Sequence, residues 1–273
     1  MASQTRAITV KTPEEIRLMY EANQIVAGVL ALLQERIQPG LSTRKLDRLA
    51  EEYCLDHGGI PAFKGYRGFP ASLCVSINEE VVHGIPSRKV ILREGDIVSV
   101  DFGVLYKGFY GDAAVTIPVG TISPEKERLL RVTREALDLA IDQVRVGNRV
   151  SDISRAVQAH VEKNGFSVVR QFVGHGIGSS LHESPEVPNY VQKNASSPRI
   201  REGMVFAIEP MVNAGTYKVK VLKDEWTVVT ADRKPSAHFE HSVAATSEGP
   251  YVLSKRNMSA GRVEEDVRSG LKN

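Results

Sequence analysis

The chain has 273 residues, of which 42% are hydrophobic and 25% charged, and its formal net charge at pH 7 is +2. We expect an ordinary soluble globular protein with one large domain or two small ones. The small net charge and the scattered lysines and arginines argue against direct nucleic-acid binding, and the apolar stretches fall far short of the roughly 18 residues that suggest a membrane span. The N-terminus lacks an apolar signal-peptide core, and the two cysteines provide no disulfide framework. These features together predict a cytoplasmic protein.

Residues 1–11 are predicted to form a flexible arm, and two helices follow it. Thr12, a proline and Glu15 have the pattern of a helix N-cap with a capping box. Apolar residues then recur at helical spacing until the Pro-Gly pair at 39–40, which should end the helix. A second helix is predicted over 42–58.

A loop and several strands come next. Residues 60–71 are rich in glycine, proline and aromatic residues, which is typical of a loop. Strands are predicted at 73–77 and 81–86, and a third strand, short and apolar, reaches Asp101.

The same order of elements then recurs in the second half of the chain. Ser123 opens a capped helix as Thr12 does, at an offset of 111 residues, and a second short helix and further strands follow. The segments 93–101 and 201–209 correspond position for position at an offset of 108. Their last residues, Asp101 and Glu209, are therefore expected to be equivalent positions that meet where the two halves join.

We predict one α+β domain with internal pseudo-symmetry. It should span residues 12–255, in halves of about 12–120 and 121–255, with helices outside a central antiparallel sheet. Residues 256–273 are polar and are expected to form a loosely held C-terminal tail. A cleft between such halves is the usual place for a site.

Four carboxylates stand in segments that should be apolar strands. Asp101, Asp112, Glu209 and Glu240 each lie within or at the end of such a run, although acidic residues are disfavoured in strands and a buried carboxylate is costly unless paired or bound to a metal. His175 is framed by glycines, and we predict a turn that presents its imidazole. Taken singly, His175 would be a turn histidine and Asp101 a cap or an arginine partner. The five together, within a repeat, predict a metal site.

The ligand types suggest which metals and which chemistry. One imidazole and four carboxylates carry more negative charge than one divalent cation usually requires, so two metals bridged by shared carboxylates, roughly 3.5–4 Å apart, fit better. A nitrogen and oxygen set without thiolate favours Mn, Fe, Co or Zn. A hydroxide bridging such ions is a ready nucleophile, which makes metal-assisted hydrolysis the leading reaction class.

At this point the sequence resembles the type I methionine aminopeptidases, which have the pita-bread fold. The family's histidine signature is present in Phe172-Val-Gly-His-Gly-Ile-Gly178, His182 and the Val-Pro-Asn-Tyr run at 187–190, and the resemblance covers about residues 12–254. The five metal positions also match in order and context. They are Asp101, Asp112, His175, Glu209 and Glu240. The resemblance implies that Asp112 and Glu240 bridge two divalent ions, that Asp101 binds one ion through both oxygens, and that His175 and Glu209 bind the other.

The resemblance also implies catalytic and substrate-binding residues. Glu209 would shuttle a proton from the nucleophilic water, His182 would hydrogen-bond the scissile amide and its oxyanion, and His83 would contact the peptide and assist the leaving amine. The family builds its methionine pocket at the positions of Phe63, Tyr66, Phe69, Cys74, Leu181 and Trp226, and a narrow apolar slot suits a thioether. Judged without the family, the aromatic residues are packing residues, Cys74 is a small buried hydrophobe and His83 a core residue. His238 and His241 flank Glu240 as candidate supporting partners.

The chain departs from the family pattern at two positions of the histidine signature. Leu181 stands where an aromatic residue or methionine is common, and Ser179 stands where a basic residue is often found. Both departures concern the shape of the pocket. The type II insertion is absent and we expect no zinc-finger or proline-rich extension before the domain, so the resemblance is to the short bacterial-style form.

The implied function is removal of the N-terminal methionine from peptides and nascent proteins, at the ribosome, when the second residue is small. The enzyme is expected to act in the cytoplasm as a monomer, without direct contact to nucleic acid or membrane. Three alternatives stay open: a proline-directed peptidase of the same fold, which usually carries an extra N-terminal domain; a catalytically inactive pita-bread protein that binds partners, although such proteins lose metal ligands; and a metal-dependent hydrolase of another substrate.

Overall fold

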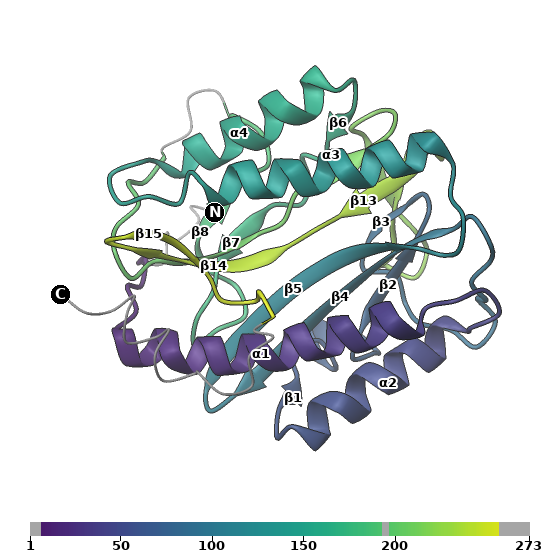
Figure 1. Ribbon diagram of the computed structural model, residues 1–273, viewed down its shortest axis with the longest axis horizontal. Coiled ribbons are helices and arrows are strands. Elements are labelled where there is room, and N and C mark those ends of the chain that lie inside the picture. The colour runs from purple at the N-terminus through teal and green to yellow at the C-terminus, as the bar shows by residue number, and fades with distance from the viewer. Residues whose placement is uncertain (1–6, 193–196, 257–273) are drawn as a thin grey trace.

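The computed structural model describes residues 7–192 and 197–256. Helices α1 (Pro13–Arg36) and α2 (Thr43–Asp56) cover one side of the strands, and α3 (Pro124–Ile141) and α4 (Val150–Lys163) cover the other (Figure 1). The helix starts follow the predicted capping. Glu15 N donates to Thr12 Oγ1 at 3.3 Å and Thr12 N donates to the Glu15 carboxylate at 2.7 Å, which completes the capping box. The two helix pairs are the repeated unit predicted from the sequence.

A long hairpin dominates the first half. Strands β4 (Ile97–Tyr106) and β5 (Phe109–Pro118) pair antiparallel along their whole length, and β1 (Ile60–Pro61) and β2 (Cys74–Ile77) pair with β4 as well. Helix α1 lies against the hairpin at Gly111, where a Cβ atom would come within 2.8 Å of the backbone nitrogen of Asn23. The glycine is therefore needed for this close approach.

The second half holds three further groups of strands. A five-stranded sheet has the order β15 (Gly249–Val252), β14 (His241–Thr246), β9 (Val205–Ile208), β7 (Gly174–Gly176) and β8 (Glu183–Val187). A three-stranded sheet joins β13 (Ser236–His238), β10 (Met211–Asn213) and β6 (Ser167–Val168). Another three-stranded sheet has β12 (Val228–Thr230) between β11 (Val219–Val221) and β3 (Glu80–Val82), so a strand of the first half pairs with one of the second.

The two halves meet where β5 runs beside β14 (Figure 1). A single bridge joins Ala114 to Glu240, and Ser242 Oγ donates to the carbonyl of Asp112 at 2.8 Å. Every strand pair among the described residues is antiparallel, so the prediction of an α+β fold with antiparallel pairing is confirmed. The strands of the described chain form four hydrogen-bonded sheets rather than one. Contacts between β5 and β14 are isolated, and a strand ladder between the halves joins β3 to β12 instead.

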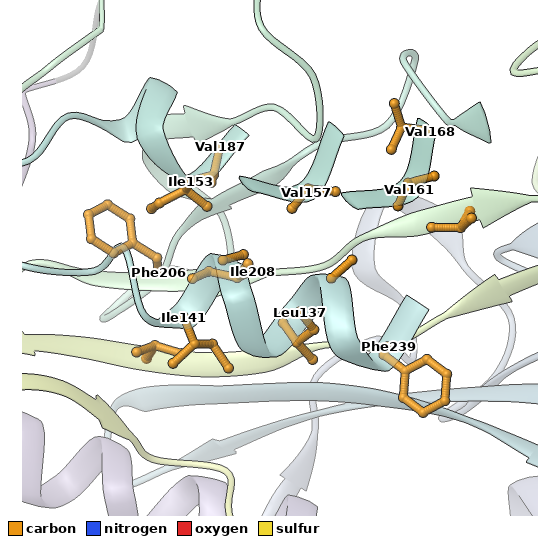
Figure 2. Packing of buried hydrophobic residues seen from close by; sticks show 14 of the residues in the cluster. Leu137, Ile141, Ile153, Val157, Val161, Val168, Val187, Phe206, Ile208 and Phe239 are labelled. Atoms are coloured by element: carbon orange, nitrogen blue, oxygen red, sulfur yellow. The ribbon is translucent and has the colours of Figure 1, made fainter. Parts of the chain in front are cut away.

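Each half has its own hydrophobic core beneath its helices. Under α3 and α4, side chains such as Leu137, Ile141, Val157 and Phe206 pack between the helix pair and the strands (Figure 2). A second cluster lies under α1 and α2 and includes Phe102. The acidic residues on the strands between these two cores are therefore held by rigid, well-packed elements.

Helix α1 is long and apolar enough to pass a test for a membrane span by length and composition. However, 61% of the 18-residue apolar stretch of this helix is buried inside the molecule, and the helix packs against β4 and β5. These contacts are those of a core helix in a globular domain.

Three segments differ from the predictions. His175 lies on the short strand β7 rather than on a turn, because its neighbours pair with both β8 and β9. Strand β3 stops at Val82, since His83 has a φ of 59°, which no strand residue adopts. The predicted flexible arm is packed against the domain at its end, where Lys11 is buried. Residues 1–6 of the arm and 257–273 of the predicted tail lie outside the described residues.

Candidate metal centre and active site

One cavity brings the sequence-predicted residues together. It has a volume of about 280 Å³ and lies where the two halves meet. Its lining includes the thirteen residues predicted to bind metal or substrate or to take part in catalysis, namely Phe63, Tyr66, Phe69, Cys74, His83, Asp101, Asp112, His175, Leu181, His182, Glu209, Trp226 and Glu240. Acidic groups, histidines and an apolar wall therefore share one space.

The β4–β5 hairpin places two of the carboxylates side by side. Asp112 pairs with Gly103, which lies two residues from Asp101 on the same strand. Because side chains alternate between the faces of a strand, Asp101 and Asp112 point to the same face. The hairpin register alone therefore builds half of the acidic cluster.

The other half of the cluster comes from the five-stranded sheet and its edges. His175 pairs with Ala207 on β9, Glu209 directly follows that strand, and Glu240 is bridged to Ala114 of β5. His175 Nδ1 donates to the carbonyl of Gly176 at 2.9 Å. Since a carbonyl only accepts, Nδ1 carries the proton and the lone pair of Nε2 faces the acids, 3.6 Å from Glu209 Oε1.

Several buried oxygens in this cluster have no hydrogen-bond partner among the described residues. They are Asp101 Oδ1, Asp112 Oδ1 and Glu240 Oε1. Ligand atoms of Asp112, His175 and Glu240 lie within 4.8 Å of one another. Buried polar atoms are nearly always satisfied in folded proteins, so this set of unpaired oxygens points to a bound cation.

The electrostatics of the cluster support the same conclusion. Burial raises the pKa of Asp101 to about 7. Burial, and then the charge of neighbouring carboxylates, raises the pKa values of Asp112, Glu209 and Glu240 well above their usual range. Burial lowers the pKa of His175 to about 4, which keeps the imidazole neutral and able to ligate a metal. Divalent cations would relieve the repulsion that these raised pKa values express.

Cys74 lies opposite Asp101 in the β2–β4 ladder and also lines the cavity. Burial raises the pKa of its thiol well above the usual value, so the sulfur stays protonated and is a poor ligand. The donor set is therefore oxygen and imidazole nitrogen, which suits Mn, Fe, Co or Zn. The residues present fit a divalent metal centre.

Two further histidines border the metal centre. The rings of His182 and His175 lie 4.2 Å apart, and the Tyr66 hydroxyl lies 2.8 Å from His182 Nδ1. Burial lowers the pKa of His182 to about 3 and that of His83 to about 4, so both are neutral at pH 7. The His83 ring meets Phe172 edge-on, with the ring centres 5.5 Å apart.

The apolar wall of the cavity is continuous with the core. Phe69 is buried with Cys74, and Trp226 packs edge-on against Phe69 at 5.1 Å. Leu181 is buried in the cluster that contains residues of α1, with Phe63 and Tyr66 packed against that cluster. These contacts fix the width of the slot next to the metal centre.

The structure adds residues that the sequence did not single out for the site. Arg67 and Phe172 line the cavity. His238, by contrast, was predicted as a supporting partner, and its Nε2 lies 3.7 Å from Glu209 Oε2 without a hydrogen-bond partner among the described residues. Phe172 stands three residues before the glycine-framed His175, so its place in the histidine signature was the available signal. Arg67 has a φ of 50° in a loop, for which the sequence pattern offers no signal.

Comparison with known proteins decides the family. A sequence model of the family described as Metallopeptidase family M24 matches residues 17–247. The chain belongs to this family. A methionine aminopeptidase of Clostridium perfringens is 53% identical over 246 residues, which cover 90% of this chain and 98% of the relative. Methionine aminopeptidase 1 of Bacillus subtilis is 51% identical over 248 residues, covering 91% and 99%.

Solved structures agree with this assignment. The methionine aminopeptidase of Thermotoga maritima superposes with a TM-score of 0.89 at 45% identity and covers 92% of this chain and all of that one. An Xaa-Pro dipeptidase of Bacillus anthracis has the same fold, with a TM-score of 0.73 at 23% identity, but this chain covers only 63% of it. Among M24 proteins, the chain groups with the methionine aminopeptidases. The predicted fold class and the predicted enzyme class, a metal-dependent methionyl aminopeptidase, are thereby confirmed.

Proposed function

We propose that this M24 member removes the N-terminal methionine from peptides and nascent proteins by hydrolysis at a centre of two divalent metal ions. The observation that carries the proposal is the single cavity in which an acid-and-imidazole cluster adjoins a narrow apolar wall. Asp101, Asp112, His175, Glu209 and Glu240 would hold the ions. Ions bound there supply a Lewis acid for the scissile carbonyl and a nucleophilic water near neutral pH.

The protein's own groups complete the reaction. Glu209 lies at the edge of the acidic cluster and is assigned to move a proton between the attacking water and the leaving amine. If the Tyr66 hydroxyl donates to His182 Nδ1, His182 Nε2 carries the proton. That N–H is assigned to the oxygen of the scissile amide as it becomes negative. His83, which lines the cavity beside Trp226, is assigned to the peptide backbone and the leaving amine.

The apolar wall selects the side chain at the N-terminus. Phe63, Phe69, Leu181 and Trp226 enclose a slot that suits an unbranched thioether. We expect a small second residue such as alanine, glycine or serine, which requires that the cavity walls leave little room past the scissile bond. The proposed setting is the cytoplasm, with nascent chains at the ribosome as substrates and a monomeric enzyme.

Turnover of short peptides tests the proposal. Metal-loaded protein should release methionine from Met-Ala-Ser, should act much more slowly on Met-Arg-Ser, and should leave Ala-Pro-Ser intact. Release of the first residue from Ala-Pro-Ser would instead indicate a proline-directed peptidase. Comparable turnover of Met-Ala-Ser and Met-Arg-Ser would refute the proposed specificity.

A further inference from the structure

The end of the N-terminal arm is fastened to the segment that carries His182. The Lys11 ammonium donates to Glu183 Oε2 at 2.6 Å and to Thr9 Oγ1 at 2.7 Å, and the Thr9 hydroxyl in turn donates to the same carboxylate oxygen. The side chains of Lys11 and Glu183 are only 4% and 10% exposed. The Lys11 backbone also donates to the carbonyl of Gly203 at 2.7 Å. This buried ion pair joins residues that are 172 positions apart.

The other oxygen of Glu183 closes the segment 178–183 upon itself. Glu183 Oε1 accepts from the Ser180 backbone at 3.1 Å and from the Ser179 hydroxyl at 3.5 Å. Leu181 and His182 lie between these groups, and Leu181 is buried against α1, the helix that begins two residues after Lys11. The segment is therefore fastened at two points to the start of the chain, and His182 lies between them.

Gly178 shows how closely the ion pair lies against this segment. A Cβ atom at position 178 would collide with Lys11 Cε and would come within 2.6 Å of Glu183 Oε1. The lysine side chain thus occupies the space where a side chain on the loop would be. If Lys11 lost its ammonium, Glu183 would be left as a largely buried charge without its main partner, and the loop would have to move to hydrate it.

We propose that Lys11 is a positioning residue, which holds His182 in place for catalysis by pinning Glu183. Lys11 is not among the residues that line the cavity, so its influence on the reaction would pass through the loop. The inference deepens the proposed function and rests on it, because His182 is given its role there. A displacement of about 1 Å in a catalytic group can lower a rate on the order of 10²-fold.

The test compares Lys11→Met with Lys107→Met. Lys107 makes an exposed ion pair with Glu21 at 2.8 Å and serves as the matched control. On Met-Ala-Ser, Lys11→Met should lower kcat about 10- to 100-fold, with KM within about twofold and with unchanged metal content. Lys107→Met should behave as the unchanged protein. In a His182→Ala background, Lys11→Met should cause no further loss, because the group through which it acts is gone.

Either of two kinetic outcomes would overturn the proposal. One is a kcat for Lys11→Met equal to that of Lys107→Met, and the other is an equal fall of kcat with and without His182. Backbone hydrogen exchange of residues 178–183 should be faster in Lys11→Met than in Lys107→Met, and equal rates would also overturn it. Hydrogen exchange does not depend on turnover. If the wild-type protein were inactive on Met-Ala-Ser, the proposed function would be refuted, and the exchange rates would still test whether Lys11 holds the loop. If Lys11→Met does not fold, Thr9→Val should show a smaller effect in the same direction, and an unchanged kcat would overturn the proposal.

Discussion

At the scale of single residues, the site could be predicted from the sequence because acidic residues are rare in apolar strand segments. Asp101 and Asp112 lie in strands, where carboxylates are disfavoured, and Glu209 and Glu240 lie directly beside strands. The structure places all four in one cavity with His175. Contacts between distant positions have no such local signature. The bond from Tyr66 to His182 spans 116 residues and the pair of Lys11 with Glu183 spans 172, and no period or motif encodes either.

His175 and His182 should fail in different ways when each is changed to alanine. His175→Ala removes a ligand nitrogen, so metal affinity and activity should fall together. His182→Ala removes only a hydrogen-bond donor to the reacting amide, and loss of one such donor costs on the order of 10²–10³ in kcat, about 2.7–4 kcal/mol. KM should change little, because the contact strengthens in the transition state.

Calorimetric titration with Mn and steady-state kinetics on the same preparations separate the two roles. Normal metal binding with collapsed turnover is expected for His182→Ala. Loss of a metal ion in that variant, or retention of most of its kcat, would show that the assigned role is wrong.

At the scale of elements, the N-cap residues predicted where helices begin more accurately than the apolar and glycine pattern predicted the strands. Thr12 and Ser123 both accept a hydrogen bond from the first turn of their helices, as their positions indicate. The glycines around His175 suggested a turn, yet the backbone there is paired on both sides as β7. Glycine is used in this strand for close approach, since a Cβ at Gly174 would collide with the Ala207 carbonyl. The sequence shows the glycine but not what approaches it.

The packing of α1 on the hairpin gives a stability prediction. Gly111→Ala places a methyl group within 2.8 Å of the Asn23 backbone nitrogen, and neither element can shift without disturbing its core. Overpacking of this kind costs about 1–3 kcal/mol. Leu139→Ala, at an exposed helix position, should stay within about 0.5 kcal/mol of the unchanged protein. Urea denaturation of both variants measures the difference, and equal stability would mean that α1 does not press on β5 as described.

At the scale of the whole molecule, the internal repeat predicted that two halves meet at Asp101 and Glu209. It did not predict that β3 of one half pairs with β12 of the other, because such an exchange depends on the path of the connecting loops. The repeat also gave no hint that the arm before the first half is fastened to the second half at Glu183. The internal repeat therefore predicts the elements that both halves contain, but it does not predict the contacts between the halves.

The stability of the metal-free molecule should fall as the pH rises from 6.5 to 8. Burial raises the pKa of Asp101 from its ordinary value of 3.8 to about 7. Between these values Asp101 holds a proton in the folded chain that it has released in the unfolded chain. The contribution of Asp101 to the stability of the folded chain is therefore present at low pH and is lost as the pH rises through about 7. The lowered pKa of His175 acts in the opposite sense, mainly below 6.5, where most of the unfolded imidazole is protonated, and this effect fades above that pH.

Melting temperatures at pH 6.5 and 8 check this sign. The loss of melting temperature on removal of metal should be larger at pH 8, where the ionised cluster has no cation to neutralise it. Metal-free Asp101→Asn should show a smaller fall between the two pH values than the unchanged protein. A metal-free protein whose melting temperature rises over this interval would contradict the raised carboxylate pKa values.

Removal and return of metal is the most direct test of the account. Protein treated with a chelator should bind two divalent ions per chain when Mn, Co or Fe is returned, and its turnover of Met-Ala-Ser should disappear and recover with them. Asp112→Asn, which replaces a carboxylate with a neutral amide of the same shape, should weaken this binding and keep turnover low. Full turnover of Met-Ala-Ser by protein shown to be free of metal would contradict the account.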